Sequence, residues 1–152
     1  MMPGRFHGTL RTTYINKDWI RSHQCPIDKV RFSYTTSDGR KKCLPDHFLS
    51  DGGSIPRIFQ NIVRRDELMP AWILHDRDYA IQDIPRDLAD YDLSEMIYTL
   101  SCGYSWIRRG IIWALVHSFG SIPWKYNQSD KRKAQIAAMK KLVPVGDLVF
   151  GE

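Results

Sequence analysis

The sequence predicts an α+β protein in which a small N-terminal antiparallel β-sheet precedes a bundle of about four helices. In the first third of the chain, β-branched and aromatic residues alternate with polar ones, and helical spacing of apolar residues dominates the rest. Two of the helices are joined by so short a loop that they must run antiparallel. A chain of 152 residues is expected to form one domain. Its parts are a β region over 1–49, a helical core over 50–127, and a basic helix and tail over 128–152.

The composition is that of an ordinary globular protein, with 43% hydrophobic and 26% charged residues. A formal charge of +5 favours an acidic partner only mildly, and the basic residues do not alternate with aromatic ones as nucleic-acid binding would require. No apolar stretch is long enough for a transmembrane helix, and no signal-peptide pattern opens the chain. Three cysteines without a C-x-x-C spacing indicate neither a disulfide framework nor a thiolate zinc site.

The β region is predicted from residues 5–15 and 29–36. Val30, Phe32 and Tyr34 alternate with polar residues, which is the pattern of a half-buried strand. Asp38-Gly39 then predicts a two-residue type I′ turn and a hairpin that ends before Pro45. We expect these strands to form one small sheet.

A glycine-rich loop follows the sheet. In Asp51-Gly52-Gly53-Ser54, paired glycines let the backbone turn sharply and present polar groups to a ligand, and Asp51 adds a carboxylate. The structural alternative is a turn followed by a short helix over 55–63, with Ser54 as its N-cap and Pro56 in its first turn.

The central helix, expected over 70–80, carries the most unusual polar residues of the chain. His75 and Asp76 interrupt an apolar run, and Tyr79 lies four residues after His75 and shares its face. Asp90, early in the next helix, is expected to approach that face across the helix hairpin. These residues form either a catalytic or metal site, or a buried polar network that fixes how the helices pack.

The second helix is expected over 86–100 and the third over 106–119, with Gly120 to Trp124 ending the third. The third helix is predicted to bury five apolar residues, namely Ile107, Ile111, Trp113, Leu115 and Val116. Asp78 and Asp83 are expected to be solvated and, with Asp76, to form a loose acidic rim. A basic amphipathic helix over 128–142 is expected either to be solvated or to contact an anionic surface or a partner protein.

Residues 44–120 resemble a family of uncharacterised proteins encoded by tailed phages and prophages. The residues that carry the likeness are Pro45, Phe48, Asp51-Gly52-Gly53-Ser54-Ile55-Pro56-Arg57, His75-Asp76 with Tyr79, Arg86 with Ala89-Asp90, Glu95-Met96 and Phe119-Gly120. Gly53 departs from the alanine expected there, and Asp46-His47 replaces an expected glycine. The resemblance implies a protein made in the cytoplasm of a bacterial host, where incorporation into the virion is one option.

The same order of motifs also resembles the catalytic core of phospholipase A2 proteins, particularly compact viral ones without disulfides. That resemblance implies that Asp76 binds Ca²⁺ together with Asp51, Gly52 and Gly53. It also implies that His75 activates water, that Asp90 holds the imidazole and that Tyr79 braces Asp90. Arg57 and Arg86 are candidate counter-charges, and together with Ser54 they are candidate binding residues.

Two functions therefore stand side by side. The first is an accessory or virion protein of a phage that acts in particle assembly or on the host, through contacts with phage or host proteins made by the basic C-terminal helix and tail. The alternative is a calcium-dependent, phospholipase A2-like hydrolase that acts on host envelope lipids, with an anionic lipid surface as partner. Whether the protein is an enzyme stays open at this level.

Overall fold

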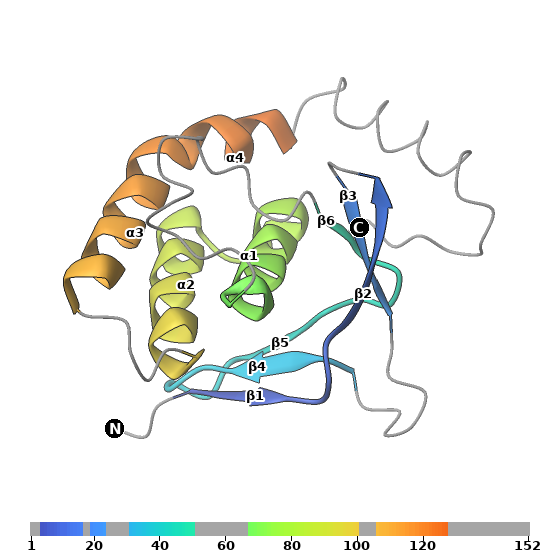
Figure 1. Cartoon of the computed structure of the whole chain (residues 1–152). Coiled ribbons are helices and arrows are strands. Elements are labelled where there is room, and N and C mark those ends of the chain that lie inside the picture. The colour runs from blue at the N-terminus through green and yellow to red at the C-terminus, as the bar shows by residue number, and fades with distance from the viewer. Residues whose placement is uncertain (1–3, 17–18, 24–30, 51–66, 101–105, 128–152) are drawn as a thin grey trace.

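The structure is a computed structural model that describes residues 4–16, 19–23, 31–50, 67–100 and 106–127 (Figure 1). Several predicted features lie outside these residues: the loop residues Asp51, Gly52, Gly53, Ser54 and Arg57, the short helix over 55–63, and the basic helix over 128–142.

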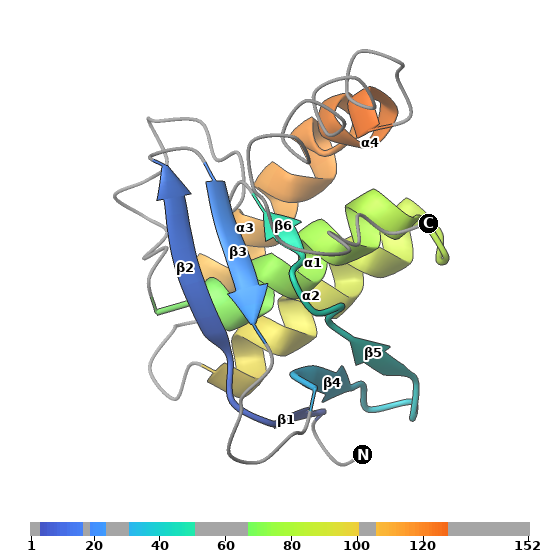
Figure 2. The same ribbon diagram turned by 90° about the vertical axis from the view of Figure 1, so that its right-hand side faces the viewer.

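Within the described residues, the β region forms two three-stranded antiparallel sheets rather than the single sheet expected. One sheet has the order β1-β4-β5, from strands Arg5–His7, Ser33–Thr35 and Lys41–Cys43. The other has the order β2-β3-β6, from Arg11–Asn16, Trp19–His23 and Leu49–Ser50. In Figure 2 the pair β2 and β3 runs upright on one side, and β1, β4 and β5 lie below the helices.

The hairpin between β4 and β5 is confirmed, but its turn differs from the prediction. Thr36 N donates to Arg40 O at 2.9 Å, which leaves three residues in the loop instead of two. Gly39 has a φ of +89°, whereas the φ of Asp38 is not positive. A type I′ turn needs positive φ at both central positions. Because only Gly39 meets this requirement, the turn is not of type I′.

Four helices follow in the described part of the chain: α1 (Met69–Ile81), α2 (Arg86–Leu100), α3 (Trp106–Phe119) and α4 (Ser121–Asn127). The predicted bounds of α2 and α3 are confirmed, and α1 is close to its expected range. The segment expected to end the third helix instead forms α4. Gly120 N bonds to Val116 O and Trp124 N bonds to Gly120 O, so helical hydrogen bonding continues through the glycine.

Helix α1 is the centre of the molecule, with α2 on one side and α3 beyond α2 (Figures 1 and 2). Helix α4 lies above α1 in Figure 1, and the two sheets lie around the rest. Its residues Ala71, Trp72, Ile73 and Leu74 are all buried in succession, so nearly every face of this helix meets protein. Pro70 fits the first turn, where its missing N–H costs nothing, and Gln82 ends the helix in a left-handed conformation with φ +56°.

Hydrogen bonds between residues far apart in the sequence join the β1-β4-β5 sheet to α2. The buried hydroxyl of Tyr34 donates to Glu95 Oε1 at 2.9 Å, and Ser37 N donates to the same oxygen at 2.8 Å. Phe6 packs on Tyr34 with ring centroids 4.6 Å apart. The sheet therefore meets the helices through an aromatic layer with satisfied polar groups.

Helix α3 corrects the prediction of its buried side. Ile112 is its one buried residue, while Leu115 and Val116 are half-buried. Ile107, Ile111 and Trp113, which were expected in the core, are exposed. The helix is apolar over most of its circumference, so its spacing alone could not identify which side faces inward. Within the described residues, no helix combines the length and apolar character needed to cross a membrane.

Candidate functional site

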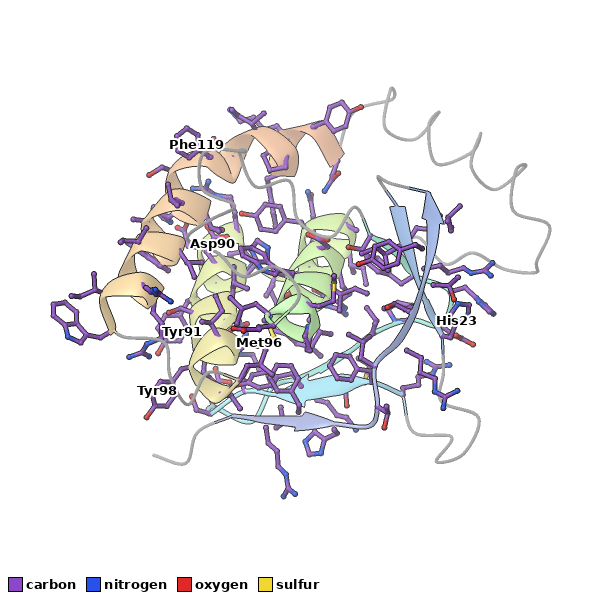
Figure 3. The ribbon with its side chains drawn as sticks, in the orientation of Figure 1. His23, Asp90, Tyr91, Met96, Tyr98 and Phe119 are labelled. Atoms are coloured by element: carbon purple, nitrogen blue, oxygen red, sulfur yellow. The ribbon has the colours of Figure 1, made fainter. Side chains whose placement is uncertain are left out.

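The predicted approach of the two helices is present, and it centres on Asp90. His75 Nε2 lies 3.1 Å from Asp90 Oδ1, and the Tyr79 hydroxyl donates to the same oxygen at 2.6 Å. His75 and Tyr79 belong to α1, one turn apart, while Asp90, labelled in Figure 3, belongs to α2. Asp90 is 1% exposed and His75 is 5% exposed. The three side chains thus form a buried hydrogen-bonded group, which we call the His75 triad.

The electrostatics fix the role of each member. Burial by itself raises the pKa of Asp90, but hydrogen bonds from His75 and Tyr79 and the nearby charge of Arg86 outweigh it and leave that pKa below its usual value. Burial, together with the bond to Asp90, raises the pKa of Tyr79, so this phenol keeps its proton. Because an ionised carboxylate only accepts hydrogen bonds, the hydrogen between Asp90 and His75 sits on His75 Nε2. An imidazole that donates its one hydrogen from Nε2 carries its lone pair on Nδ1.

Aromatic rings and a glycine hold the triad in place. The Tyr79 ring packs against His75, with ring centroids 4.3 Å apart, and meets Trp124 of α4 edge-on at 5.0 Å. A Cβ atom at Gly120 would lie 2.2 Å from the Tyr79 hydroxyl oxygen. The absence of a side chain at Gly120 is thus what allows the phenol to reach Asp90.

The end of α3 closes the group from the other side. His117 Nδ1 lies 3.7 Å from Asp90 Oδ2, and these two buried atoms have no hydrogen-bond partner within the described part of the chain. Arg86 Nη1 donates to His117 O at 3.1 Å, which ties the start of α2 to the end of α3. The predicted counter-charge role of Arg86 therefore has a structural basis, because its guanidinium lies beside the triad and influences Asp90.

Asp76 points away from the triad, as its place on the helix predicts. Its Oδ2 accepts a hydrogen bond from the hydroxyl of Ser50, the last residue of β6. The chain passes directly from Ser50 into Asp51-Gly52-Gly53. Asp76 therefore lies where the glycine-rich loop begins. Among the described residues, no three His, Cys, Asp or Glu side chains form a group that could hold a metal ion, and the predicted ligands Asp51, Gly52 and Gly53 lie outside those residues.

A second polar group, which the sequence did not predict, lies between β5 and the helices. Lys42 Nζ lies 2.6 Å from Asp92 Oδ2 of α2 and also pairs with Asp78 of α1. Arg40 makes two bonds of 2.8 Å to Asp92. The expectation that Asp78 is solvated is wrong, because its side chain is 0% exposed and also pairs with Arg77 at 2.8 Å. We call Arg40, Lys42, Asp78 and Asp92 the buried ion cluster.

Sequence reasoning also missed the parts played by His117 and Gly120. A signal for the cluster existed, because Asp92 falls between Ala89 and Met96 at helical spacing and so occupies the buried face of α2. His117 has no such signal, since its contact with Asp90 depends on how α3 packs against α2. Ser54 and Arg57 lie outside the described residues.

The fold and site together define a class of protein: an α+β protein in which an antiparallel helix pair encloses a buried His-Asp-Tyr group beside two small sheets. Residues 29–116 match the model of a family described as protein of unknown function (DUF1353). The match covers more than half of the chain, so the protein belongs to this family. No curated protein and no solved structure matches the chain.

Proposed function

We propose that the protein is a hydrolase of carboxylic esters, of the phospholipase A2-like kind, with His75 as its general base. The observation that carries this proposal is the contact of His75 Nε2 with an ionised, buried Asp90, which Tyr79 also bonds. A histidine held in one tautomer by a carboxylate is the arrangement that general-base chemistry near neutral pH requires. Asp76, one residue further along α1, lies outside that group and accepts a hydrogen bond from Ser50, which directly precedes the glycine-rich loop in the sequence.

The chemical step needs few groups. His75 Nδ1 takes a proton from a water molecule as its oxygen attacks the ester carbonyl, and the resulting imidazolium is stabilised by the Asp90 carboxylate. As the tetrahedral intermediate collapses, the bond to the alcohol oxygen breaks and the imidazolium returns the proton to that oxygen. Tyr79 holds Asp90 in position and keeps its own proton throughout, because its pKa is raised.

A calcium ion fits the chemistry of the predicted donor set. Asp76 would hold it together with oxygens of Asp51, Gly52 and Gly53, since carboxylate and carbonyl oxygens are the ligands that Ca²⁺ prefers. When bound, the ion would polarise the ester carbonyl and stabilise its developing negative charge. Asp76 is half-buried and accepts a hydrogen bond from Ser50, the residue that precedes the loop in the sequence, which supports this assignment.

The test is fatty-acid release from mixed phospholipid vesicles with calcium. His75→Ala should lower the rate by about 10²- to 10⁴-fold, because it removes the general base. The variant's helix content by circular dichroism shows whether it is folded. His7→Gln is the matched control, since His7 lies on β1 and bonds Thr35 instead of Asp90. Equal release by wild type and His75→Ala, or no release from any envelope lipid, would refute the proposal.

A second candidate is a phage-associated accessory or virion protein without catalytic activity. The observation that favours it is the burial of His75, which is 5% exposed, because a buried and hydrogen-bonded polar group also serves to lock helices together. The resemblance to phage-encoded proteins supports this role. Mass spectrometry of intact particles would then detect the protein, and His75→Ala would lower stability in a protein that releases no fatty acid before or after the change.

A further inference from the structure

One face of the β2-β3-β6 sheet gathers four basic side chains. Arg21 and His23 are two residues apart on β3 and therefore lie on the same face of the sheet. Arg11 of β2 stands opposite His23 in the strand register, which puts its side chain on that face too. His47 completes the group, because its ring centroid lies 5.8 Å from that of His23. We call Arg11, Arg21, His23 and His47 the basic cluster.

The opposite face of this sheet belongs to the interior of the protein. Ile20 and Ser50 form the neighbouring cross-strand pair, in which Ile20 is buried and Ser50 donates to Asp76 of α1. Since successive residues of a strand point to opposite faces, the basic cluster lies on the side turned away from α1. Figure 3 labels His23 on the side of the molecule away from α2 and α3. The basic cluster is therefore separate from the His75 triad.

Three nitrogen atoms of the basic cluster lack a partner. Arg21 Nε, Arg21 Nη1 and His47 Nδ1 are enclosed by protein, and none has a hydrogen-bond partner within the described part of the chain. A buried polar atom left unpaired destabilises a protein, and the penalty is larger for a charged group such as a guanidinium. Because Arg21 Nε and Nη1 hold no partner there, turning the guanidinium outward breaks no hydrogen bond of either atom. The Arg21 side chain is thus ready to bind an acceptor that arrives from outside.

The backbone at His47 is held in a conformation that costs energy. Its φ of +58° lies in the left-handed region, which residues other than glycine rarely adopt. His47 N donates to Ser22 O at 3.1 Å and to Asp46 Oδ1 at 3.0 Å, and these bonds hold the residue there. Residues kept in such conformations cluster at functional sites. The residue so held is the one whose ring meets His23 edge-on.

The charge of the basic cluster indicates the kind of acceptor that it binds. Among the recorded contacts of its described residues, two guanidinium groups stand against the carboxylate of Asp46, whose Oδ2 lies 3.6 Å from His47 Nε2. Burial, followed by the effects of Arg21 and His47, places the pKa of His23 below its ordinary value, while Asp46 acts in the opposite direction. A phosphate group suits these donors, because it has several strong acceptor oxygens and a guanidinium binds two of them at once.

We propose that the basic cluster binds a phosphate group, with Arg21 donating to two of its oxygens and with His23 and His47 contacting the others. Arg11, which is exposed, adds positive charge at the rim of the site. The phosphate arrives either as a soluble phosphate ester or as the headgroup of an anionic phospholipid, and the chemistry of the contact is the same. The proposal is independent of the esterase activity, because no member of the basic cluster belongs to the His75 triad.

Titration of the full chain with inorganic phosphate, followed by NMR of the histidine rings, tests this proposal. The resonances of His23 and His47 should shift to saturation, while those of His7, on the other sheet, should not. Arg21→Met keeps the aliphatic stem and removes the guanidinium, so phosphate binding measured by calorimetry should weaken by about tenfold or more. Arg5→Met removes the same charge from an exposed position of β1 and should leave binding unchanged. Sodium chloride at equal ionic strength accounts for screening.

Two further measurements keep the test decisive. Circular dichroism shows whether Arg21→Met is folded, and Arg21→Lys, which keeps the charge but loses the paired donors, should bind phosphate with intermediate affinity. Flotation with vesicles that contain phosphatidylglycerol distinguishes the two sources of phosphate. Flotation that Arg21→Met abolishes and that inorganic phosphate reverses assigns the lipid headgroup, whereas binding of inorganic phosphate without flotation assigns a soluble ester.

Three results would overturn the proposal. The first is a titration in which the His23 and His47 resonances do not shift to saturation. The second is a folded Arg21→Met variant that binds phosphate as tightly as the wild type does. The third is acetate that shifts the same resonances as far as phosphate does at equal concentration, which would show a general attraction of anions. None of these results requires fatty-acid release, so the proposed function and this proposal can fail separately.

Discussion

The space left by one missing methyl group determines the geometry of the His75 triad. Gly120 lies where any Cβ would meet the Tyr79 hydroxyl at 2.2 Å and the carbonyl of Val116 at 2.5 Å. Neither neighbour can move freely, because the hydroxyl is bonded to Asp90 and the carbonyl is part of the helix backbone. Alanine at this position must therefore displace either Tyr79 or the junction between α3 and α4.

We expect Gly120→Ala to lower the free energy of unfolding by about 1–3 kcal/mol, the usual cost of overpacking a filled site. Gly110→Ala is the matched control, because a Cβ there meets nothing and alanine favours the helix by roughly 0.5–1 kcal/mol. Urea unfolding of the two variants and the wild type measures both effects. Equal effects of the two substitutions would contradict the close packing of Tyr79 on Gly120.

Asp90 makes stability depend on pH in a definite direction. Its pKa is lower in the folded protein than the ordinary value of about 3.9. A group with a lowered folded pKa adds stability above its unfolded pKa, and that stability is lost as pH falls through the folded value. Asp90→Asn should therefore be less stable than wild type at neutral pH, and the difference should shrink in acid below about pH 4.

Urea unfolding at a series of pH values measures this difference. Asp87→Asn is the control, because Asp87 lies on the same helix but its side chain is 78% exposed. A gap between wild type and Asp90→Asn that stays constant from neutral pH into acid would show that Asp90 is not held ionised by its neighbours.

At the scale of elements, the buried ion cluster joins strand β5 to both central helices. Lys42 reaches Asp78 of α1 and Asp92 of α2, and all three side chains are at most 4% exposed. A buried pair of this kind need not stabilise more than apolar residues would, but it penalises any arrangement that leaves one charge without its partner. The cluster therefore specifies how the hairpin sits against the helices.

Lys42→Met leaves Asp78 and Asp92 buried with one cation fewer. We expect a loss of about 3–5 kcal/mol in the free energy of unfolding, as when a buried ion pair loses one member. Lys41→Met is the matched control, since Lys41 is the exposed neighbour on the opposite face of the same strand. Chemical unfolding of both variants gives the comparison, and a Lys42→Met loss as small as that of Lys41→Met would contradict this role.

At the scale of the whole molecule, sequence patterns within a few residues predict the helices, whereas contacts between residues far apart in the chain are harder to predict. The bounds of α2 and α3 follow from apolar spacing and from proline and glycine at the ends, which act within a few residues. The contact of His75 with Asp90 was predictable because a short loop forces α1 and α2 together. Phe119, Tyr91 and Tyr98 in Figure 3 lie on the side of the molecule away from β2 and β3. Local sequence patterns do not predict which side chains α3 leaves exposed there.

The features that could not be predicted depend on residues far apart in the chain. The pairing of β1 with β4 and of β3 with β6 skips over intervening strands, so consecutive order gave no guide to the two sheets. The sequence around Asp78 predicts a solvated carboxylate, because its partner Lys42 lies 36 residues earlier and no local pattern indicates their contact. The inward side of α3 is chosen by tertiary packing between helices that are apolar on several faces.

The short loop between α1 and α2 also bears on the order of folding. His75 and Asp90 are 15 residues apart, and Tyr79 and Asp90 are 11 apart, whereas Tyr34 and Glu95 are separated by 61. Contacts between near residues cost less chain entropy to close and form faster. The helix hairpin can thus assemble the His75 triad before either sheet docks. A chain stopped at that stage would already hold its histidine and carboxylate together, without the ion cluster that later fastens the sheet.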